Sequence, residues 1–184
     1  FLDEEGKKIS KSVGKGLTVD AWVHYAPIES LLYYIYQNPK RARRLFWDVV
    51  PKCVDDYLDA LRRYPDIEES KRPEQDIWHT GDRGSAVPEY GAQVNFSTVN
   101  NLIAALGSDS VELLVDYLER YDERASSYPQ VMQSLVEKGH NYYRDFVLPN
   151  KKAREPSDEE RALLAKMAER LGAANGVTED ELQG

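Results

Sequence analysis

The sequence predicts an all-helical protein. Apolar residues recur at spacings of three and four along most of the 184 residues, which is the period of one face of an α-helix. Ser, Thr, Asp or Asn precedes several of these apolar runs, and Gly or Pro follows several of them, as at helix starts and ends. There is neither an internal repeat nor a heptad run long enough for a coiled coil. We therefore expect a helical bundle.

Composition and charge narrow the class of protein. Hydrophobic residues make up 41% and charged residues 30%, which is ordinary for a globular protein. No apolar run approaches the roughly 18 residues that a membrane helix needs, and no secretory leader is visible, so we expect a cytoplasmic protein. The formal net charge is -8, so a surface for nucleic acid must be a local patch. Cys53, the single cysteine, stands in a helical pattern and predicts a buried, inert thiol.

The first sixteen residues differ from the rest. They are rich in glycine and lysine and poor in apolar residues, which predicts a mobile loop. Beyond them, Thr18 can cap a short helix that runs through Trp22 to Tyr25. Pro27 suits the first turn of a second helix, because its missing N–H would be unpaired there anyway. The apolar face of this second helix consists of Leu31, Leu32, Ile35 and Tyr36.

Two further helices are predicted before residue 65. Asn38 and Pro39 repeat the cap-and-proline pattern and predict a helix through Phe46. Asp48 is a candidate cap for the next helix, with Pro51 in its first turn. The apolar stripe of that helix is Val50, Val54, Tyr57, Leu58 and Leu61, and the pair Asp55 and Asp56 is expected on its solvated face.

Residues 65–95 hold prolines and glycines without a sustained period and predict a long connection, with a short extended piece at residues 93–95. Ser97 is the candidate cap of the following helix, which Gly107 ends. Asp109 and Glu112 mark the next helix start.

A longer helix over residues 129–147, stopped by Pro149, and a helix that begins with the capping box of Ser157 and Glu160 complete the pattern. Thr178 and Glu181 have the same capping-box spacing only a few residues before the last one. Together with the start at Phe1, this predicts a piece of a longer chain.

The stretch Lys8-Ile9-Ser10-Lys11-Ser12 carries the chemistry of the sequence. Two ammonium groups three residues apart can neutralise phosphate oxygens, and hydroxyls and backbone N–H groups can donate hydrogen bonds to them. Gly14 and Gly16 would let the loop close over a nucleotide and reopen. The glycine spacing of a P-loop is absent, and by themselves these five residues also fit a solvated basic tail.

This stretch resembles the Lys-Met-Ser-Lys-Ser signature of class I aminoacyl-tRNA synthetases, with Ile9 in the methionine position. Further segments, in order and at matching spacing, resemble the class I lysyl-tRNA synthetases, and Lys15 departs from the family by standing where Asn is usual. The segments are Gly16–Trp22, Tyr25–Leu31, Arg44–Pro51, Val54–Leu58, Trp78–His79, Asn141–Phe146 and Glu155–Pro156. The resemblance covers roughly residues 5–165.

The resemblance implies a piece of an ATP-dependent lysine–tRNA ligase that begins just before this catalytic loop. Such enzymes activate lysine with ATP, which is a substrate accompanied by Mg, and transfer the lysine to tRNA(Lys) in protein biosynthesis. Lys11 would be the main ATP contact and Lys8 would assist it, both as catalytic residues, while Ile9, Ser10 and Ser12 complete the ATP-binding loop. The family's His-Ile-Gly-His signature is absent, so the chain alone is expected to be inactive.

Two basic clusters are candidate tRNA contacts. The first is Lys40, Arg41, Arg43 and Arg44, and the second is Lys151, Lys152 and Arg154. A solvated helix face and a solvated loop are the alternatives, and neither cluster has the interleaved aromatics of a single-strand binder. His24, His79 and His140 are too scattered for a metal site, and His140 is expected to pack beside Tyr143. No membrane or DNA partner is expected.

The predicted organisation has three parts. Residues 1–16 would be the loop of a nucleotide-binding domain, residues 17–148 a helical region that resembles the stem-contact region, and residues 149–184 the start of the anticodon-binding helical cage. Two alternatives stay open: another class I synthetase, such as one for glutamate, and a non-catalytic helical interaction module.

Overall fold

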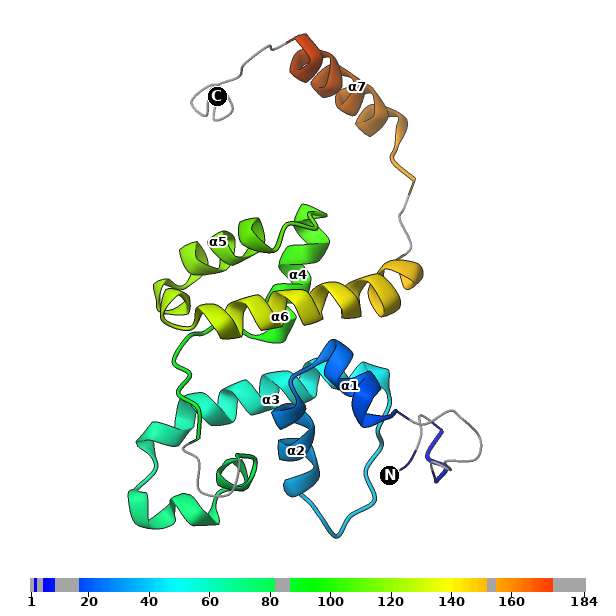
Figure 1. Cartoon of the computed structure of the whole chain (residues 1–184). Helices are drawn as coiled ribbons and strands as arrows, with labels where there is room; N and C mark the ends of the chain where they lie inside the picture. Colours follow the sequence, from blue (N-terminus) through cyan, green and yellow to red (C-terminus); the bar gives the residue numbers. More distant parts are fainter. Residues whose placement is uncertain (1, 3–4, 9–16, 82–86, 152–154, 174–184) are drawn as a thin grey trace. The chain divides into compact units, whose positions relative to one another are not determined.

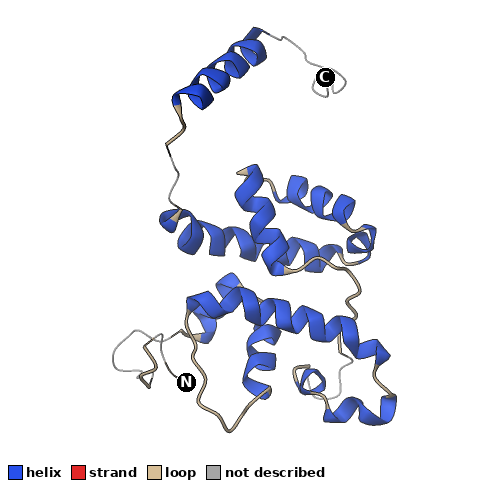
Figure 2. Cartoon of the chain, turned by 180° about the vertical axis from the view of Figure 1, so that it is seen from behind, coloured by secondary structure: helices blue, strands red, loops and turns tan. Residues whose placement is uncertain are grey.

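The computed structural model describes residues 2, 5–8, 17–81, 87–151 and 155–173. The chain divides into two compact units, residues 1–150 and residues 151–184. The described residues fold into helices without a strand (Figures 1 and 2), which confirms the predicted all-helical class. No helix in this part of the chain is long and apolar enough to cross a membrane.

Helices α1 (Val19–Tyr25) and α2 (Ile28–Tyr36) form a tight corner around Trp22. The Thr18 hydroxyl accepts a hydrogen bond from the Ala21 N–H at 3.1 Å, so the predicted cap of α1 is confirmed. The Trp22 side chain is fully buried, and its Nε1–H donates to the Pro27 carbonyl at 3.1 Å and to the Ser30 hydroxyl at 3.2 Å. These bonds fix the angle between the two helices from inside the core.

The helix predicted from Pro39 through Phe46 is not formed. Residues 42–46 run without helix, and a 3₁₀ turn (Trp47–Val49) leads into α3 (Val50–Arg63). The cause is tertiary: the Leu45 N–H donates to the carbonyl of Leu2 at 2.8 Å instead of to a helical carbonyl, and the Leu45 side chain is buried. The predicted cap at Asp48 is also wrong, because α3 has Val49 at its N-cap and no side chain caps it.

Helix α3 buries the stripe that the sequence predicts, and Pro51 lies in its first turn as expected. Cys53 is 2% exposed, so the expected burial is confirmed. Burial raises the pKa of the Cys53 thiol to about 12. The thiol is therefore protonated at neutral pH and chemically quiet.

In its described residues, the connection after α3 contains three 3₁₀ helices, Tyr64–Asp66, Glu69–Glu74 and Asp76–His79, rather than an α-helix. The extended piece predicted at residues 93–95 forms no strand. Val94 is nevertheless fully buried, and the Tyr90 hydroxyl donates to its carbonyl. The end of the connection is thus part of the core.

Helix α4 (Phe96–Leu106) is capped differently from the prediction. Asn95, not Ser97, is the N-cap, and its side chain accepts from the Thr98 N–H at 2.7 Å. Asp55 on α3 adds a second cap, since its carboxylate accepts from the Phe96 N–H at 2.7 Å and from the Ser97 hydroxyl at 2.5 Å. Asp55, which was expected on a solvated face, instead joins α3 to α4.

Gly107, with φ +58°, ends α4 as predicted. Helix α5 (Val111–Tyr121) starts within the predicted region, but the Ser110 hydroxyl rather than Asp109 caps it. Helix α6 (Pro129–Tyr142) continues as a π-helix (Tyr143–Val147) and ends in a 3₁₀ turn (Leu148–Asn150). The predicted extent of 129–147 is therefore confirmed, with a wider last turn.

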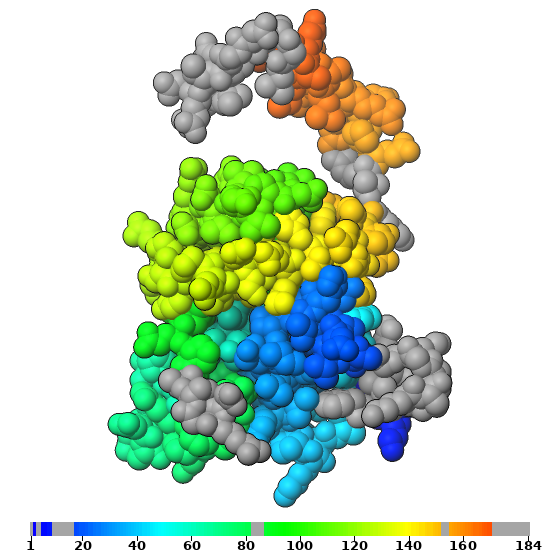
Figure 3. Space-filling view, in the orientation of Figure 1, coloured from blue at the N-terminus to red at the C-terminus, as the bar shows by residue number. Residues whose placement is uncertain are grey.

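Helix α6 packs on α1, α4 and α5 and thereby holds this unit together. Figure 3 shows the surface of α1 directly against that of α6, where Lys138 Nζ donates to the Val23 carbonyl at 2.8 Å and Asn141 Nδ2 to the His24 carbonyl at 3.1 Å. A Cβ on Gly139 would lie 2.9 Å from Val99 Cγ1, so glycine permits the close approach of α6 to α4.

The second unit contains α7 (Asp158–Ala173). The Ser157 N–H donates to the Glu160 carboxylate at 2.8 Å, and the Ser157 hydroxyl accepts from the Glu160 N–H at 3.3 Å, so the predicted capping box is confirmed. The second predicted box, at Thr178 and Glu181, lies outside the described residues.

Candidate functional site

Lys8 is the one member of the predicted ATP-binding motif that lies in the described part of the chain. Ile9, Ser10, Lys11 and Ser12 lie outside the described residues. The Lys8 side chain is exposed, and its backbone forms an isolated antiparallel bridge with Leu2. Gly6, with φ +80°, lies in the turn between the two, in a conformation that glycine adopts without strain.

The other side of Leu2 pairs with the segment before α3. The Leu2 N–H donates to the Arg43 carbonyl at 2.8 Å, the Leu45 N–H donates to the Leu2 carbonyl at 2.8 Å, and Leu2 forms a parallel bridge with Arg44. Three short stretches of backbone, around residues 8, 2 and 44, thus lie side by side. The segment that carries Lys8 is anchored to the helical unit through this pairing.

Helix α2 holds residues 43 and 44 in turn. The Tyr34 hydroxyl donates to the Arg44 carbonyl at 2.6 Å. The Arg43 guanidinium lies 3.6 Å from the centre of the Tyr34 ring, and its Nη1 donates to the Tyr34 carbonyl and, at 3.2 Å, to Gln37 Oε1. Burial raises the pKa of the Tyr34 hydroxyl, so this group is a proton donor throughout the neutral range.

The first predicted tRNA cluster is therefore divided. Lys40, Arg41 and Arg44 have exposed side chains, whereas Arg43 is half-buried and turned onto α2. In the second cluster Lys151 is exposed, and Lys152 and Arg154 lie outside the described residues. The three exposed cations of the first cluster can reach a phosphate backbone, whereas Arg43 packs on the Tyr34 ring.

An exposed aromatic cluster lies at the C-terminal end of α2, shortly before Lys40 along the chain. Tyr36 stacks on His79 with ring centres 5.0 Å apart and an interplanar angle of 3°, and Trp78 meets His79 edge-on at 5.0 Å. Tyr36 is 45% and Trp78 43% exposed. The sequence does not reveal this aromatic cluster, because Trp78 and His79 reach Tyr36 only through the tertiary fold.

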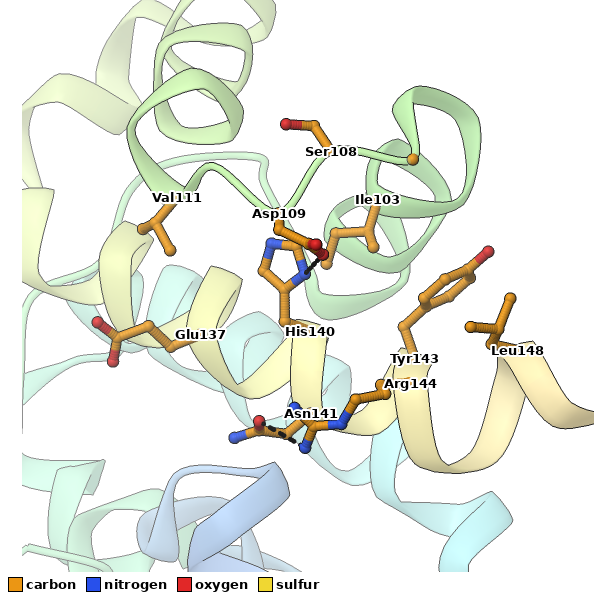
Figure 4. A pocket seen from close by; sticks show the side chains of 11 residues that line it. Ile103, Ser108, Asp109, Val111, Glu137, His140, Asn141, Tyr143, Arg144 and Leu148 are labelled. Carbon is orange, nitrogen blue, oxygen red and sulfur yellow. Dashed lines mark hydrogen bonds and ion pairs between the residues drawn. The ribbon is translucent and has the colours of Figure 1, made fainter.

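A groove of about 810 Å³ lies on a different face, between the α4–α5 loop and α6 with its π-helical end (Figure 4). His140 Nδ1 lies 4.0 Å from the Asp109 carboxylate, while its buried Nε2 has no hydrogen-bond partner among the described residues. Tyr143 lines the same groove, and Arg144 pairs with Asp145 at 2.9 Å. The groove carries charges of both signs and contains no residue of the predicted ATP-binding motif.

Metal-ligating side chains do not gather in the described part of the chain: no three His, Cys, Asp or Glu residues there come together as a metal site. The Asp55 carboxylate is used as a helix cap.

The sequence was compared with those of known protein families and proteins. The sequence profile of the class I (K) tRNA synthetases matches residues 1–83. This range includes the Lys8–Ser12 motif, Leu2 and residues 43–45, which pair with one another, and the aromatic cluster. No solved structure matches the chain.

Curated relatives match farther along the chain. The lysine–tRNA ligase of Roseobacter denitrificans is 38% identical over 98% of this chain and 34% of the relative. The ligase of Rickettsia bellii is 35% identical over 93% of this chain and 33% of the relative, and that of Rickettsia conorii 33% identical over 98% and 35%. The chain thus spans about a third of the length of the curated relatives it matches. Over nearly its whole length, the chain is thus similar to part of the class I lysine–tRNA ligases.

Proposed function

We propose that these residues work within a lysine–tRNA ligase that activates lysine with ATP and esterifies tRNA(Lys) in the cytoplasm. The observation that carries this proposal is the profile match over residues 1–83. The matched range includes both the Lys8–Ser12 motif, with its two lysines, and helix α2, to which the segment of Lys8 is anchored. The chain would supply the phosphate-contacting loop and part of the tRNA-contacting helical region. Residues 1–16, 17–148 and 149–184 would serve as catalytic loop, stem-contact region and start of the anticodon-binding region.

The reaction explains the choice of lysines. A carboxylate oxygen of the substrate lysine forms a bond to the α-phosphorus of ATP, while the bond from that phosphorus to the oxygen bridging to the β-phosphate breaks and pyrophosphate leaves. Negative charge builds up on the phosphate oxygens in the transition state, and positioned ammonium groups stabilise it. Lys11 and Lys8 would act in this way without gaining or losing a proton, and the Ser10 and Ser12 hydroxyls would donate hydrogen bonds.

Magnesium would enter the reaction with ATP, bound to its phosphates. Hard cations such as Mg²⁺ require oxygen ligands, and among the described residues no cluster of carboxylates converges.

The proposal is tested with the full-length ligase that contains this chain. Pooled tRNA is incubated with ATP and either labelled lysine or labelled glutamate. Esterification of lysine alone supports the proposal, whereas esterification of glutamate would assign the chain to a glutamyl enzyme. The coding sequence before Phe1 supplies an independent check: a His-x-Gly-His-like motif is expected there, and a start codon a few residues upstream would favour a non-catalytic helical module.

The exposed cations of the first basic cluster should contribute to tRNA binding. Changing Lys40, Arg41 and Arg44 to glutamine in the full-length ligase is expected to weaken tRNA binding and to flatten the plot of log K against log salt concentration. The slope should fall by roughly one for each tRNA phosphate that the variant no longer neutralises. Filter binding or fluorescence anisotropy over a series of salt concentrations measures it.

The matched control changes Arg63, Lys71 and Arg120 to glutamine, which removes the same number of exposed cations from elsewhere on the same unit. This control separates specific phosphate binding by the cluster from the general effect of making an acidic protein more acidic. Equal slopes for the cluster variant and the unaltered ligase would remove the cluster from the tRNA surface.

A further inference from the structure

The segment before α3 has little regular structure of its own, yet the lysine-bearing segment is anchored to it. Within the described part of the N-terminal segment, the backbone hydrogen bonds to the helical unit run from Leu2 to Arg43 and from Leu45 to Leu2. Neighbouring backbones in such pairing lie about 5 Å apart. The position of Lys8 therefore depends on where the backbone of residues 43–45 lies.

Arg43 fixes that backbone against α2. Tyr34 lies in the last turn of α2, where helix carbonyls lack a partner within the helix, and the Arg43 guanidinium donates to the Tyr34 carbonyl. The same guanidinium covers the Tyr34 ring at 3.6 Å and donates to Gln37 Oε1 at 3.2 Å. A cation at the C-terminal end of a helix is also favoured by the helix dipole. One side chain thus ties residue 43 to the helix by a stacking contact and two hydrogen bonds.

We propose that Arg43 is a positioning residue for Lys8, acting through the paired backbones of residues 43–45 and 2. A continuous chain of contacts joins helix α2 to Lys8. It leads from Tyr34 to residues 43 and 44, from there to Leu2, and from Leu2 to Lys8. This inference rests on the proposed function, because Lys8 matters here as a phosphate contact. It also gives Arg43 a role distinct from that of its exposed neighbours Lys40 and Arg41.

The first experiment measures lysine-dependent ATP–pyrophosphate exchange by the full-length ligase in the presence of saturating tRNA(Lys). Arg43→Met removes the guanidinium and keeps much of the side-chain length. It is expected to lower kcat/KM for ATP on the order of 10-fold, because a displacement of 1 Å at a reacting centre can cost up to about 100-fold. Since the tRNA is saturating for each variant, a weakened tRNA surface cannot produce this result. An unchanged kcat/KM for ATP would overturn the proposal.

Arg120→Met is the matched control. Arg120 is also an arginine beside a tyrosine ring, 5.9 Å from the centre of Tyr117, and it lies exposed on α5. Its replacement removes the same charge from the same unit and should leave the exchange rate at the level of the unaltered ligase. Arg43→Lys should restore part of the loss, since an ammonium can still reach the ring and the carbonyl of Tyr34.

A double-mutant cycle shows whether Arg43 acts through Lys8. In a Lys8→Ala background, Arg43→Met should have little further effect, because the group that it positions is gone. A general loss of structure would lower activity by the same factor in both backgrounds, and that result would overturn the proposal. Should Arg43→Met fail to fold, the milder Arg43→Lys replaces it in the same cycle. Tyr34→Phe tests the neighbouring contact, since it keeps the ring and removes only the hydrogen bond to the Arg44 carbonyl, and it is also expected to lower the exchange rate.

Failure of this inference is distinct from failure of the proposed function. An unaltered full-length protein without lysine-dependent exchange would refute the lysine–tRNA ligase function itself. An active protein in which the changes at Arg43 and Tyr34 leave exchange at the level of the Arg120→Met control would refute the positioning role alone.

Discussion

Replacing Lys11 by alanine in the full-length ligase is expected to slow adenylate formation by about 100- to 1000-fold, or roughly 3–4 kcal/mol in the transition state. The Lys11 ammonium is proposed to stabilise the charge that develops on the phosphates as pyrophosphate departs. This interaction strengthens as the reaction proceeds, so its loss should appear in kcat more than in KM for ATP. Single-turnover measurement of lysyl-adenylate formation checks it.

Lys7→Ala is the control for this change. Lys7 belongs to the same lysine-rich segment, has an exposed side chain and pairs with Glu5 at 2.6 Å, but it lies outside the two-lysine motif. A decrease confined to Lys11→Ala separates a positioned phosphate contact from the general positive charge of the segment. If the Lys11→Ala ligase forms adenylate as fast as the unaltered enzyme, the role proposed for the motif is wrong.

Replacing Trp22 by alanine is expected to destabilise the first unit by about 3–5 kcal/mol. Trp22 is fully buried in the corner between α1 and α2, and its removal leaves a cavity that the surrounding helices fill only in part. The Pro27 carbonyl would also lose one donor, although the Ser30 hydroxyl still donates to it at 2.6 Å. Urea denaturation of the 184-residue chain, followed by far-ultraviolet circular dichroism, measures the loss.

Val23→Ala, one residue farther along α1, is the matched control. Val23 is 42% exposed, so its truncation should change the free energy of unfolding by no more than about 0.5 kcal/mol. A Trp22→Ala chain whose free energy of unfolding stays within about 1 kcal/mol of that of the unaltered chain would show that the corner is held by other contacts.

Elements whose signals are local in the sequence could be predicted. The capping box of Ser157 and Glu160 is made by residues three apart, and Gly107 ends α4 by its own backbone conformation. The buried apolar stripe of α3 can be predicted from the spacing of its own apolar residues. In each case the residues that form the structure lie within a few helical turns of one another.

Elements that depend on distant partners could not be predicted. The region of Asn38 through Phe46 has a good local helix pattern, but pairing with Leu2 and stacking of Arg43 on Tyr34 hold it in another form. In the candidate site, the cations are recognisable from the sequence, but there Arg43 is indistinguishable from Lys40 and Arg41. Only the tertiary contacts separate a side chain that faces solvent from one that faces α2.

The cap that Asp55 places on α4 has a consequence for how the chain tolerates change. Because the carboxylate on α3 accepts from the first N–H groups of α4 directly, the two helices are joined by contacts that do not pass through the chain between them. Extra residues beside the exposed Ser70, at the start of the 3₁₀ helix Glu69–Glu74, would add only a small entropic penalty, since the cost of closing a loop rises slowly with its length. We therefore expect a chain with a few residues inserted there to keep the contact between α3 and α4.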